Sequence, residues 1–135
     1  MAYQAIKPLH ENKYVSFWIE NGVLVQFFKK EATTVSLRVA QQVVKDRKLV
    51  SANVPMLLLS DMGYVRAVDV DAMEYFVSEE GTSDVRSLAL YLHNYLQYTL
   101  ANIFLLYYQR QIPFPAKIVR TTQEGIQWLL HEAGV

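Results

Sequence analysis

The segment Val54-Pro55-Met56-Leu57-Leu58-Leu59-Ser60-Asp61 predicts the central strand of this protein. Its four consecutive apolar residues, 56–59, indicate a strand that is buried on both faces, as strands inside parallel sheets are. The apolar run ends in a polar corner, and the pattern predicts a new helix a few residues later. We therefore expect the other elements to lie around this strand.

The overall composition narrows the classes of protein to consider. The chain has 135 residues, which suits one domain, and 52% of them are hydrophobic, which is enough for a substantial core. Thirteen basic residues balance thirteen acidic ones, so no overall field favours nucleic acid or an anionic membrane. The lack of cysteine excludes disulfides and thiolate chemistry. The chain begins without an apolar leader, and we expect a soluble cytoplasmic protein.

One uncharged stretch, residues 87–109, is long enough to span a bilayer. Polar residues interrupt it at several points, and a strand followed by a helix explains the pattern better than a membrane span does. We therefore expect no integral membrane association.

A β-hairpin is expected before the central strand. Two β-rich runs, residues 14–20 and 23–28, flank the dipeptide Asn21-Gly22. A type I′ turn needs a positive φ angle at both of its central residues, and Asn and Gly adopt such angles more readily than other residues do. This dipeptide therefore favours a type I′ turn. The two-residue loop also fixes which residues of the two strands face each other.

The rest of the chain alternates helices with strands, which predicts parallel pairing through right-handed crossovers. The expected fold is α/β, with a mixed, mostly parallel five-stranded sheet, an N-terminal hairpin and four helices in the order ββαβαβαβα. We expect residues 1–12 to be a loose arm and residues 13–135 to be a single domain. Further strands are expected at 87–92 and 116–120, and helices at about 33–49, 71–80, 94–109 and 121–133.

The expected helix boundaries depend on capping residues. Thr33 or Thr34 can cap the first helix. Asp69 or Asp71 can cap the second, where Asp71 with Glu74 three residues later resembles a capping box. Thr121 and Glu124 form a capping box for the last helix. Gly81 is a good residue to follow the end of the second helix, because glycine readily adopts the left-handed conformation found there.

The order of the elements, together with particular residues, resembles the SpoIIAA-like fold of STAS domains (anti-sigma-factor antagonists) and their Sec14-like relatives. The resemblance covers about residues 13–133 and is most specific over 57–72, where an apolar strand ends in an Asp-containing loop that leads to a helix. The hairpin at 20–24 and the Pro-rich strand at 113–119 resemble a subgroup of small bacterial proteins of unknown role. The resemblance implies a non-catalytic regulatory or protein-interaction domain. The alternative is a carrier of a small apolar ligand or lipid, as in the Sec14-like relatives.

The loop that carries the switch in regulatory STAS domains differs in this chain. Its equivalent comprises Asp61, Asp69, Val70 and Asp71. The Asp of the family motif falls on Asp69, and the phosphorylatable serine falls on Val70, which has no hydroxyl group. Asp71 can mimic a charge but cannot be switched. We therefore expect no phosphorylation switch of the family type.

Two clusters of charge suggest other functions. The acidic segment 61–84 is compatible with a hard-cation site or an acidic docking face, but helix capping already accounts for several of its carboxylates. The basic segment 29–48 lacks the stacking aromatic residues of a nucleic-acid surface, so a solvated helix face is the simpler interpretation. We expect no metal, no cofactor and no nucleic-acid partner.

His93 follows the end of a predicted strand, where the functional groups of open α/β sheets gather. It is a candidate general base, since imidazoles titrate near neutral pH. With Ser60 and Asp61, at the end of the central strand, it would make a hydrolase site. The sequence alone does not bring such a set together, so a hydrolase is the third hypothesis, after the interaction domain and the carrier.

The helix expected at 94–109 is apolar on nearly all sides. Such a helix must be buried on more than one side, so we predict a homodimer or another protein partner on it, with an apolar ligand pocket as the alternative. Cover by neighbouring loops and the N-terminal arm would also satisfy this requirement. A pocket of about 300 Å³ or more would favour the carrier, and a flat tyrosine-rich face would favour protein interaction. The residues expected at the ligand site or interface are Tyr95, Tyr98, Leu105, Leu106 and His93.

Overall fold

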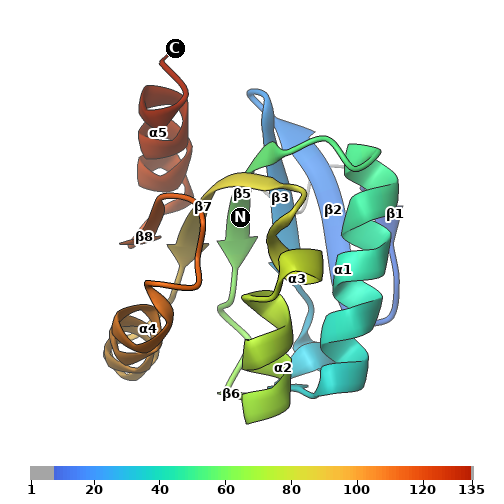
Figure 1. Cartoon of the computed structure of the whole chain (residues 1–135), viewed down its shortest axis with the longest axis vertical. Helices are drawn as coiled ribbons and strands as arrows, with labels where there is room; N and C mark the ends of the chain where they lie inside the picture. Colours follow the sequence, from blue (N-terminus) through green and yellow to red (C-terminus); the bar gives the residue numbers. More distant parts are fainter. Residues whose placement is uncertain (1–7, 135) are drawn as a thin grey trace.

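A six-stranded mixed sheet forms the centre of the protein (Figure 1). The computed structural model describes residues 8–134. The strand order is β1-β2-β3-β5-β7-β8, with antiparallel pairing from β1 to β3 and parallel pairing from β3 to β8. β5 therefore lies inside the sheet, as expected for the central strand. The strands are β1 (His10–Glu11), β2 (Val15–Glu20), β3 (Val23–Phe28), β5 (Met56–Asp61), β7 (Val85–Tyr91) and β8 (Ala116–Val119).

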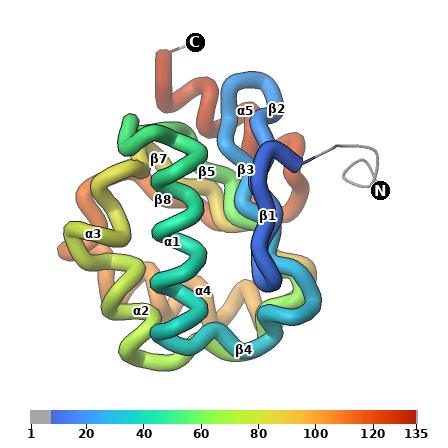
Figure 2. The backbone as a smooth tube through the Cα atoms, turned by 90° about the vertical axis from the view of Figure 1, so that its right-hand side faces the viewer, coloured from blue at the N-terminus to red at the C-terminus, as the bar shows by residue number. Residues whose placement is uncertain are grey.

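Helices cover both faces of the sheet. The helices α1 and α2 pack side by side on one face, and α5 packs on the other (Figures 1 and 2). Helix α4 connects β7 to β8 and lies apart from α1 (Figure 1). The helices are α1 (Leu37–Ser51), α2 (Val70–Phe76), α3 (Glu79–Thr82), α4 (Tyr95–Tyr108) and α5 (Thr122–Glu132).

The segment before the hairpin differs from the expected loose arm. β1 pairs with β2, and the Leu9 amide donates to the Phe17 carbonyl oxygen (2.8 Å). The His10 imidazole also lies 3.4 Å from the Asp46 carboxylate of α1. The open backbone groups of β2 explain this pairing, and they give the sheet its sixth strand. Residues 1–7 of the expected arm lie outside the described residues.

The hairpin confirms the sequence prediction. Asn21 and Gly22 have φ angles of 54° and 81°, which are the positive values that a type I′ turn requires at both positions. Glu20 pairs with Val23, so the turn has two residues. Most apolar residues of both strands are buried between the layers of helices, and Ile19, next to the turn, is 41% exposed.

Helix α1 begins later than the sequence predicts. Thr34 belongs to a short strand, β4 (Thr34–Val35), which pairs in parallel with β6 (Ala67–Val68). Ser36 takes the capping position instead, and its Oγ accepts a hydrogen bond from the Val39 amide (3.3 Å). The predicted cap at Thr33 or Thr34 is therefore wrong, because pairing with a distant segment outweighs the local capping preference.

The second predicted helix is divided into α2 and α3. Ser78 caps α3, and its Oγ accepts from the Gly81 amide (3.3 Å). Gly81 therefore lies inside α3 and does not follow a helix end, and a side chain there would collide with the Tyr75 carbonyl oxygen. Asp71 lies inside α2, so the capping box predicted for Asp71 and Glu74 is also wrong.

Two apolar cores hold the layers together. One fills the space between the sheet and helices α1 and α2, and the other lies between the sheet and α5. Alternate residues of one strand serve different cores: Leu58 of β5 belongs to the first, and Leu57 and Leu59 to the second. This double burial confirms the interpretation of the central strand.

Helix α4 matches its predicted range but not the burial expected of an apolar helix. Asn94 caps it, with Oδ1 accepting from the Gln97 amide (3.0 Å). Tyr108 is its one buried residue. The large apolar side chains along the rest of the helix are half-buried or exposed. This exposure is unusual for an apolar helix, because such side chains normally pack against the rest of the protein.

Candidate functional site

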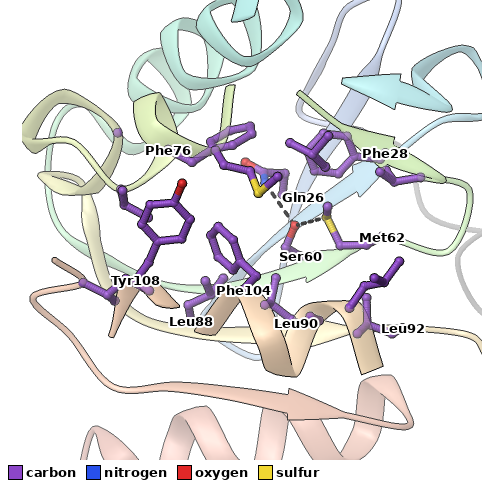
Figure 3. A pocket seen from close by; sticks show the side chains of 18 of the residues that line it. Gln26, Phe28, Ser60, Met62, Phe76, Leu88, Leu90, Leu92, Phe104 and Tyr108 are labelled. Atoms are coloured by element: carbon purple, nitrogen blue, oxygen red, sulfur yellow. Dashed lines mark hydrogen bonds between the residues drawn. The ribbon is translucent and has the colours of Figure 1, made fainter. Parts of the chain in front are cut away.

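A cavity of about 720 Å³ lies between α4, α2 and the sheet (Figure 3). Its volume is within the range of about 300–1,000 Å³ that is typical of small-molecule sites. It is also larger than the minimum of about 300 Å³ above which a pocket favours a ligand carrier over a flat interaction face. Exposed residues of α4 and α2, among them Leu100 and Val70, contribute to its lining, so the space is open to solvent beside these helices.

Apolar side chains from several elements form the walls of this cavity. Strand β7 contributes alternate residues, because side chains two positions apart point to the same face of a sheet. In Figure 3 the aromatic side chain of Phe104, from α4, points into the cavity opposite the sheet. The labelled apolar residues of the wall are Phe28, Phe76, Leu88, Leu90, Leu92, Phe104 and Tyr108.

The face of α4 that lines the cavity is an apolar stripe of Leu100, Ile103, Phe104 and Tyr107. The spacing of these residues places them on one side of a helix. Leu100, Ile103 and Tyr107 nevertheless remain 52%, 58% and 75% exposed, because the cavity separates them from the sheet. Complete burial of a large apolar side chain stabilises a structure by about 1.5–3 kcal/mol. A molecule that filled the cavity would supply part of that burial, on the side of these residues that faces the cavity.

A polar chain, consisting of Arg47, Gln26, Ser60 and Met62, crosses the floor of the cavity. The Arg47 guanidinium donates to Gln26 Oε1 (3.3 Å), and Gln26 Nε2 donates to Ser60 Oγ (3.1 Å). The Ser60 hydroxyl donates in turn to the sulfur of Met62 (3.3 Å; Figure 3). All these hydrogen bonds run in one direction, from the guanidinium toward the cavity.

A buried ion pair anchors the polar chain at its far end. Arg47 donates to both carboxylate oxygens of Asp84, from Nε at 2.9 Å and from Nη2 at 3.0 Å. The two side chains are only 3% and 1% exposed. Arg47 also donates to the Gly81 carbonyl oxygen (2.6 Å). The charge at the floor of the cavity is therefore neutralised within the protein.

The mouth of the cavity carries charges of both signs. Arg66 and Glu74 contribute to its lining and are exposed. Exposed charges at a rim are screened by water, so they contribute little to the affinity of a molecule held deep inside. The shape and apolar walls of the cavity therefore dominate what it can bind.

Gln97 ties the first turn of α4 to the loop after β5. Its Nε2 lies within hydrogen-bond distance of the carbonyl oxygens of Met62 (3.2 Å), Gly63 (3.1 Å) and Val65 (2.8 Å). Its Oε1 accepts from the His93 amide (2.9 Å). This single side chain fixes the helix at one end of the cavity.

Asp61 and His93 lie together at the carboxyl end of the sheet, with Asp61 Oδ1 and His93 Nε2 3.1 Å apart. Asp61 is fully buried and also accepts from the Gly63 amide (3.0 Å). Burial raises the pKa of Asp61, and this effect outweighs the hydrogen bonds from Gly63 and His93, which lower it. Its Oδ2 is buried and has no hydrogen-bond partner among the described residues.

Ser60 does not join this pair. Adjacent residues of a strand point to opposite faces of the sheet, and the Ser60 hydroxyl contacts Gln26 and Met62 on the cavity side. The structure thus brings together two of the three residues of the hydrolase hypothesis, Asp61 and His93, and directs Ser60 elsewhere.

The residues that the sequence analysis predicts as the equivalent of the STAS switch loop lie in different environments. Asp61 is buried at the end of β5. Asp69 occupies the position before α2 without a side-chain capping bond, and Asp71 Oδ1 accepts from the amide of the next residue (3.0 Å). Val70 begins α2, is 64% exposed and contributes to the mouth of the cavity.

The residues expected at the interface lie on other sides of α4 than the cavity stripe. Tyr95 and Leu106 are 86% and 68% exposed. Tyr98 is half-buried, and its hydroxyl accepts from Arg120 Nε (3.1 Å). Leu105 and Leu106 contribute to a second, smaller hollow of about 230 Å³.

The polar floor contains residues that the sequence analysis did not select as a site. A signal was present, because Gln26 interrupts the otherwise apolar strand 23–28, and Arg47 lies on the apolar stripe of its helix. A polar side chain on a buried face requires a partner. The partner, Asp84, lies 37 residues beyond Arg47, so its identity cannot be inferred from spacing along the chain.

Two negative findings apply to the described part of the chain, residues 8–134. None of its helices has the length and hydrophobicity needed to cross a membrane, since the uncharged stretch 87–109 divides into β7 and α4. No cluster of three or more His, Asp or Glu residues within that range is arranged to hold a metal ion.

Comparisons with known proteins establish the fold. A family model described as "Domain of unknown function (DUF7793)" matches residues 17–132. A solved structure of an uncharacterized protein from Shewanella loihica PV-4, of the DUF3478 family with a SpoIIAA-like fold, is similar over 90% of this chain and 98% of its own. The TM-score is 0.61 and the sequence identity is 11%, which confirms the SpoIIAA-like fold predicted from the sequence. No curated protein matches the chain.

Proposed function

This chain belongs to the DUF7793 family of domains of unknown function, and we propose that it is a non-catalytic domain that binds a small apolar molecule beside α4. The apolar cavity of about 720 Å³ carries this proposal, because it is large enough for a small organic molecule or a lipid chain. Among the hypotheses drawn from the sequence, the carrier therefore takes precedence over the interaction domain.

The exposed stripe of α4 supports the same function. Leu100, Ile103 and Tyr107 face the cavity but stay largely accessible to water. An apolar ligand would remove these side chains and the opposing wall of β7 from water at once. The free energy of that burial, about 25 cal/mol for each Å² of apolar surface, is available to drive binding.

The polar groups of the cavity favour binding over chemistry. Arg47 is paired with Asp84, the Thr82 hydroxyl donates to the Ser78 carbonyl oxygen (2.8 Å), and the Gln97 side chain contacts backbone groups. These groups hold the walls in place. Catalysis would require a nucleophile next to a base, and His93 does not contribute to the cavity lining.

Two matched variants of α4 test the proposal. Ala101 lines the cavity and Asn102 does not, so Ala101→Trp fills the space whereas Asn102→Trp places the same side chain outside it. Purified protein is analysed by native mass spectrometry for co-purified molecules and titrated with a hydrophobic dye that fluoresces in apolar surroundings. We expect binding by the natural protein and by Asn102→Trp, and about a tenfold or greater loss in Ala101→Trp.

Equal dye binding by the two tryptophan variants would contradict a site in this cavity. Absence of binding in the natural protein, both of co-purified molecules and of the dye, would remove the proposal altogether. Circular dichroism establishes that both variants are folded before their affinities are compared.

A protein-interaction role, with a homodimer as the simplest form, is the second candidate. The outer side of α4, which carries Tyr95 and Leu106, favours it, since large apolar side chains exposed in one patch mark interfaces. Changing Leu105 and Leu106 to aspartate should convert a dimer into a folded monomer, as measured by light scattering. A natural protein that is already monomeric at micromolar concentration would contradict the homodimer.

A further inference from the structure

The floor of the cavity ends in a hydrogen-bond donor with a poor acceptor. In the polar chain, each group donates to the next, from Arg47 through Gln26 to Ser60. Hydrogen bonds aligned in this way polarise one another, so the last donor is strengthened. That last donor is the Ser60 hydroxyl, and its acceptor is the thioether sulfur of Met62. A thioether is only a weak acceptor.

We propose that the cavity selects an uncharged, mainly apolar molecule with one hydrogen-bond acceptor oxygen, such as a ketone or an ester, and that this oxygen takes the Ser60 hydroxyl proton in place of the Met62 sulfur. This inference rests on the proposed function and adds the chemical class of the ligand. Ser60 is 2% exposed and contributes to the lining, so its hydroxyl reaches only groups inside the cavity.

The ligand is uncharged because no free charge is present at the floor. The Arg47 guanidinium is matched by both oxygens of Asp84. A carboxylate or phosphate at Ser60 would lose its hydration without gaining a cation, which is strongly unfavourable in an apolar site. The exposed Arg66 lies at the mouth rather than at the floor. A neutral carbonyl oxygen needs only one donor, and Ser60 supplies it.

The acceptor also follows from the direction of the hydrogen bonds. Ser60 Oγ already accepts from Gln26 Nε2, so what the cavity receives from Ser60 is an O–H group. Met62 is half-buried and has a flexible side chain, so its sulfur can move away when a better acceptor arrives. Apart from the Tyr108 hydroxyl, the remaining labelled side chains in Figure 3 are apolar and suit the hydrocarbon part of the molecule.

A thermodynamic cycle with two probes tests the inference. The probes are dodecan-2-one and dodecane, and their affinities are measured by displacement of the hydrophobic dye from the natural protein and from Ser60→Ala. The comparison cancels the different hydration of the two probes. A net hydrogen bond is expected to change the affinity by about twofold to tenfold. We therefore expect Ser60→Ala to weaken the ketone by about that factor and to leave the hydrocarbon unchanged.

A second variant gives the opposite expectation. Met62→Leu removes the competing sulfur while conserving the volume of the side chain. It should bind the ketone at least as tightly as the natural protein does, and it keeps the proposal testable if Ser60→Ala does not fold. Dodecanoate, which carries a charge at neutral pH, should bind the natural protein more weakly than dodecan-2-one.

The outcomes separate this inference from the proposed function. If ketone and hydrocarbon both bind and Ser60→Ala lowers the affinity for neither, the cavity binds apolar molecules but Ser60 does not donate a hydrogen bond to the ligand. Tighter binding of dodecanoate than of the ketone overturns the requirement for an uncharged ligand. If neither probe nor dye binds the natural protein, the proposed function fails, and the inference fails with it.

Discussion

Removal of the Asp84 carboxylate should destabilise this protein far more than the loss of an ordinary ion pair. The substitution Asp84→Ala leaves the Arg47 guanidinium, which is 3% exposed, without its charged partner. Both hydrogen bonds to the carboxylate, at 2.9 and 3.0 Å, are lost. A single buried charge cannot regain the hydration that it gives up on folding.

The expected loss is about 3–5 kcal/mol in the free energy of unfolding, which is typical when one partner of a buried pair is removed. An exposed pair would contribute only about 0–1 kcal/mol. Since whole domains are stable by about 5–15 kcal/mol, Asp84→Ala brings the protein close to its limit. Replacement of both members, as in Arg47→Met/Asp84→Leu, should recover most of the loss, because no charge is then left unpaired.

Urea unfolding followed by circular dichroism measures these differences, provided that the slope with urea stays constant. Ser83→Ala is the matched control: Ser83 is the neighbouring residue, its hydroxyl accepts from Lys48 Nζ (3.0 Å) and it is exposed. We expect it to change stability by at most about 0.5 kcal/mol. A loss below about 1 kcal/mol for Asp84→Ala would refute the idea that this pair is a buried anchor of the cavity floor.

Three further predictions concern the loop and helix at the mouth of the cavity. Burial raises the pKa of Asp61, so the folded state holds that proton more tightly, and the resulting stability is lost as pH rises above the ordinary value of 3.8 through the folded pKa. Asp61→Asn should therefore gain stability relative to its parent as pH rises from 3.8 toward neutral pH, measured by urea unfolding with His93→Gln as the parent. Gly63→Ala places a methyl group on the His93 ring, which should displace this partly exposed ring from Asp61. The loss of the hydrogen bond between them should cost about 0.5–1.5 kcal/mol, visible in thermal unfolding and in the imidazole NMR signals. Gln97→Ala removes the contacts with three loop carbonyls, so the amides in the first turn of α4 should exchange hydrogen faster.

Each of these predictions has a clear opposing result. A constant stability difference between Asp61→Asn and its parent across that pH range would mean that ionisation of the carboxyl is not resisted by burial. Unchanged imidazole signals in Gly63→Ala would mean that the ring has room to accept a methyl group. Unchanged exchange in Gln97→Ala would show that other contacts hold the helix, and Asn102→Ala serves there as the control on the same helix.

The features that could be predicted from the sequence are those encoded by neighbouring residues. The turn at Asn21-Gly22 needs two positive φ angles, and few other dipeptides supply them. The buried strand at 56–59 and the capping of α5 by Thr121 are equally local, and the Thr121 hydroxyl does accept from the Glu124 amide (3.0 Å). Predictions from such local patterns are confirmed where no distant segment competes for the same backbone groups.

The polar floor could not be predicted, because its members meet only after folding. Gln26 and Ser60 are 34 residues apart, and Arg47 and Asp84 are 37 apart. Spacing along the chain carries no information about such contacts. The same limit explains the missed start of α1, where Thr34 pairs with a strand more than 30 residues later. A polar residue on an apolar face indicates that a partner exists but not which residue it is.

The two candidate functions depend on different sides of one helix, and this separation follows from how α4 is held. Gln97 fixes its first turn to the loop after β5, and the buried Tyr108 packs at its last turn. Between these points the stripe of Leu100 and Ile103 turns toward the cavity, where a concave wall of strand and helix faces it. A second copy of the chain could cover the outer side around Leu106, but it would leave the cavity unfilled. A ligand would fill the cavity and leave Leu106 exposed. The sequence predicted that an apolar helix needs more than one cover, and in this fold each cover meets its own set of side chains, so single substitutions can remove one function without the other.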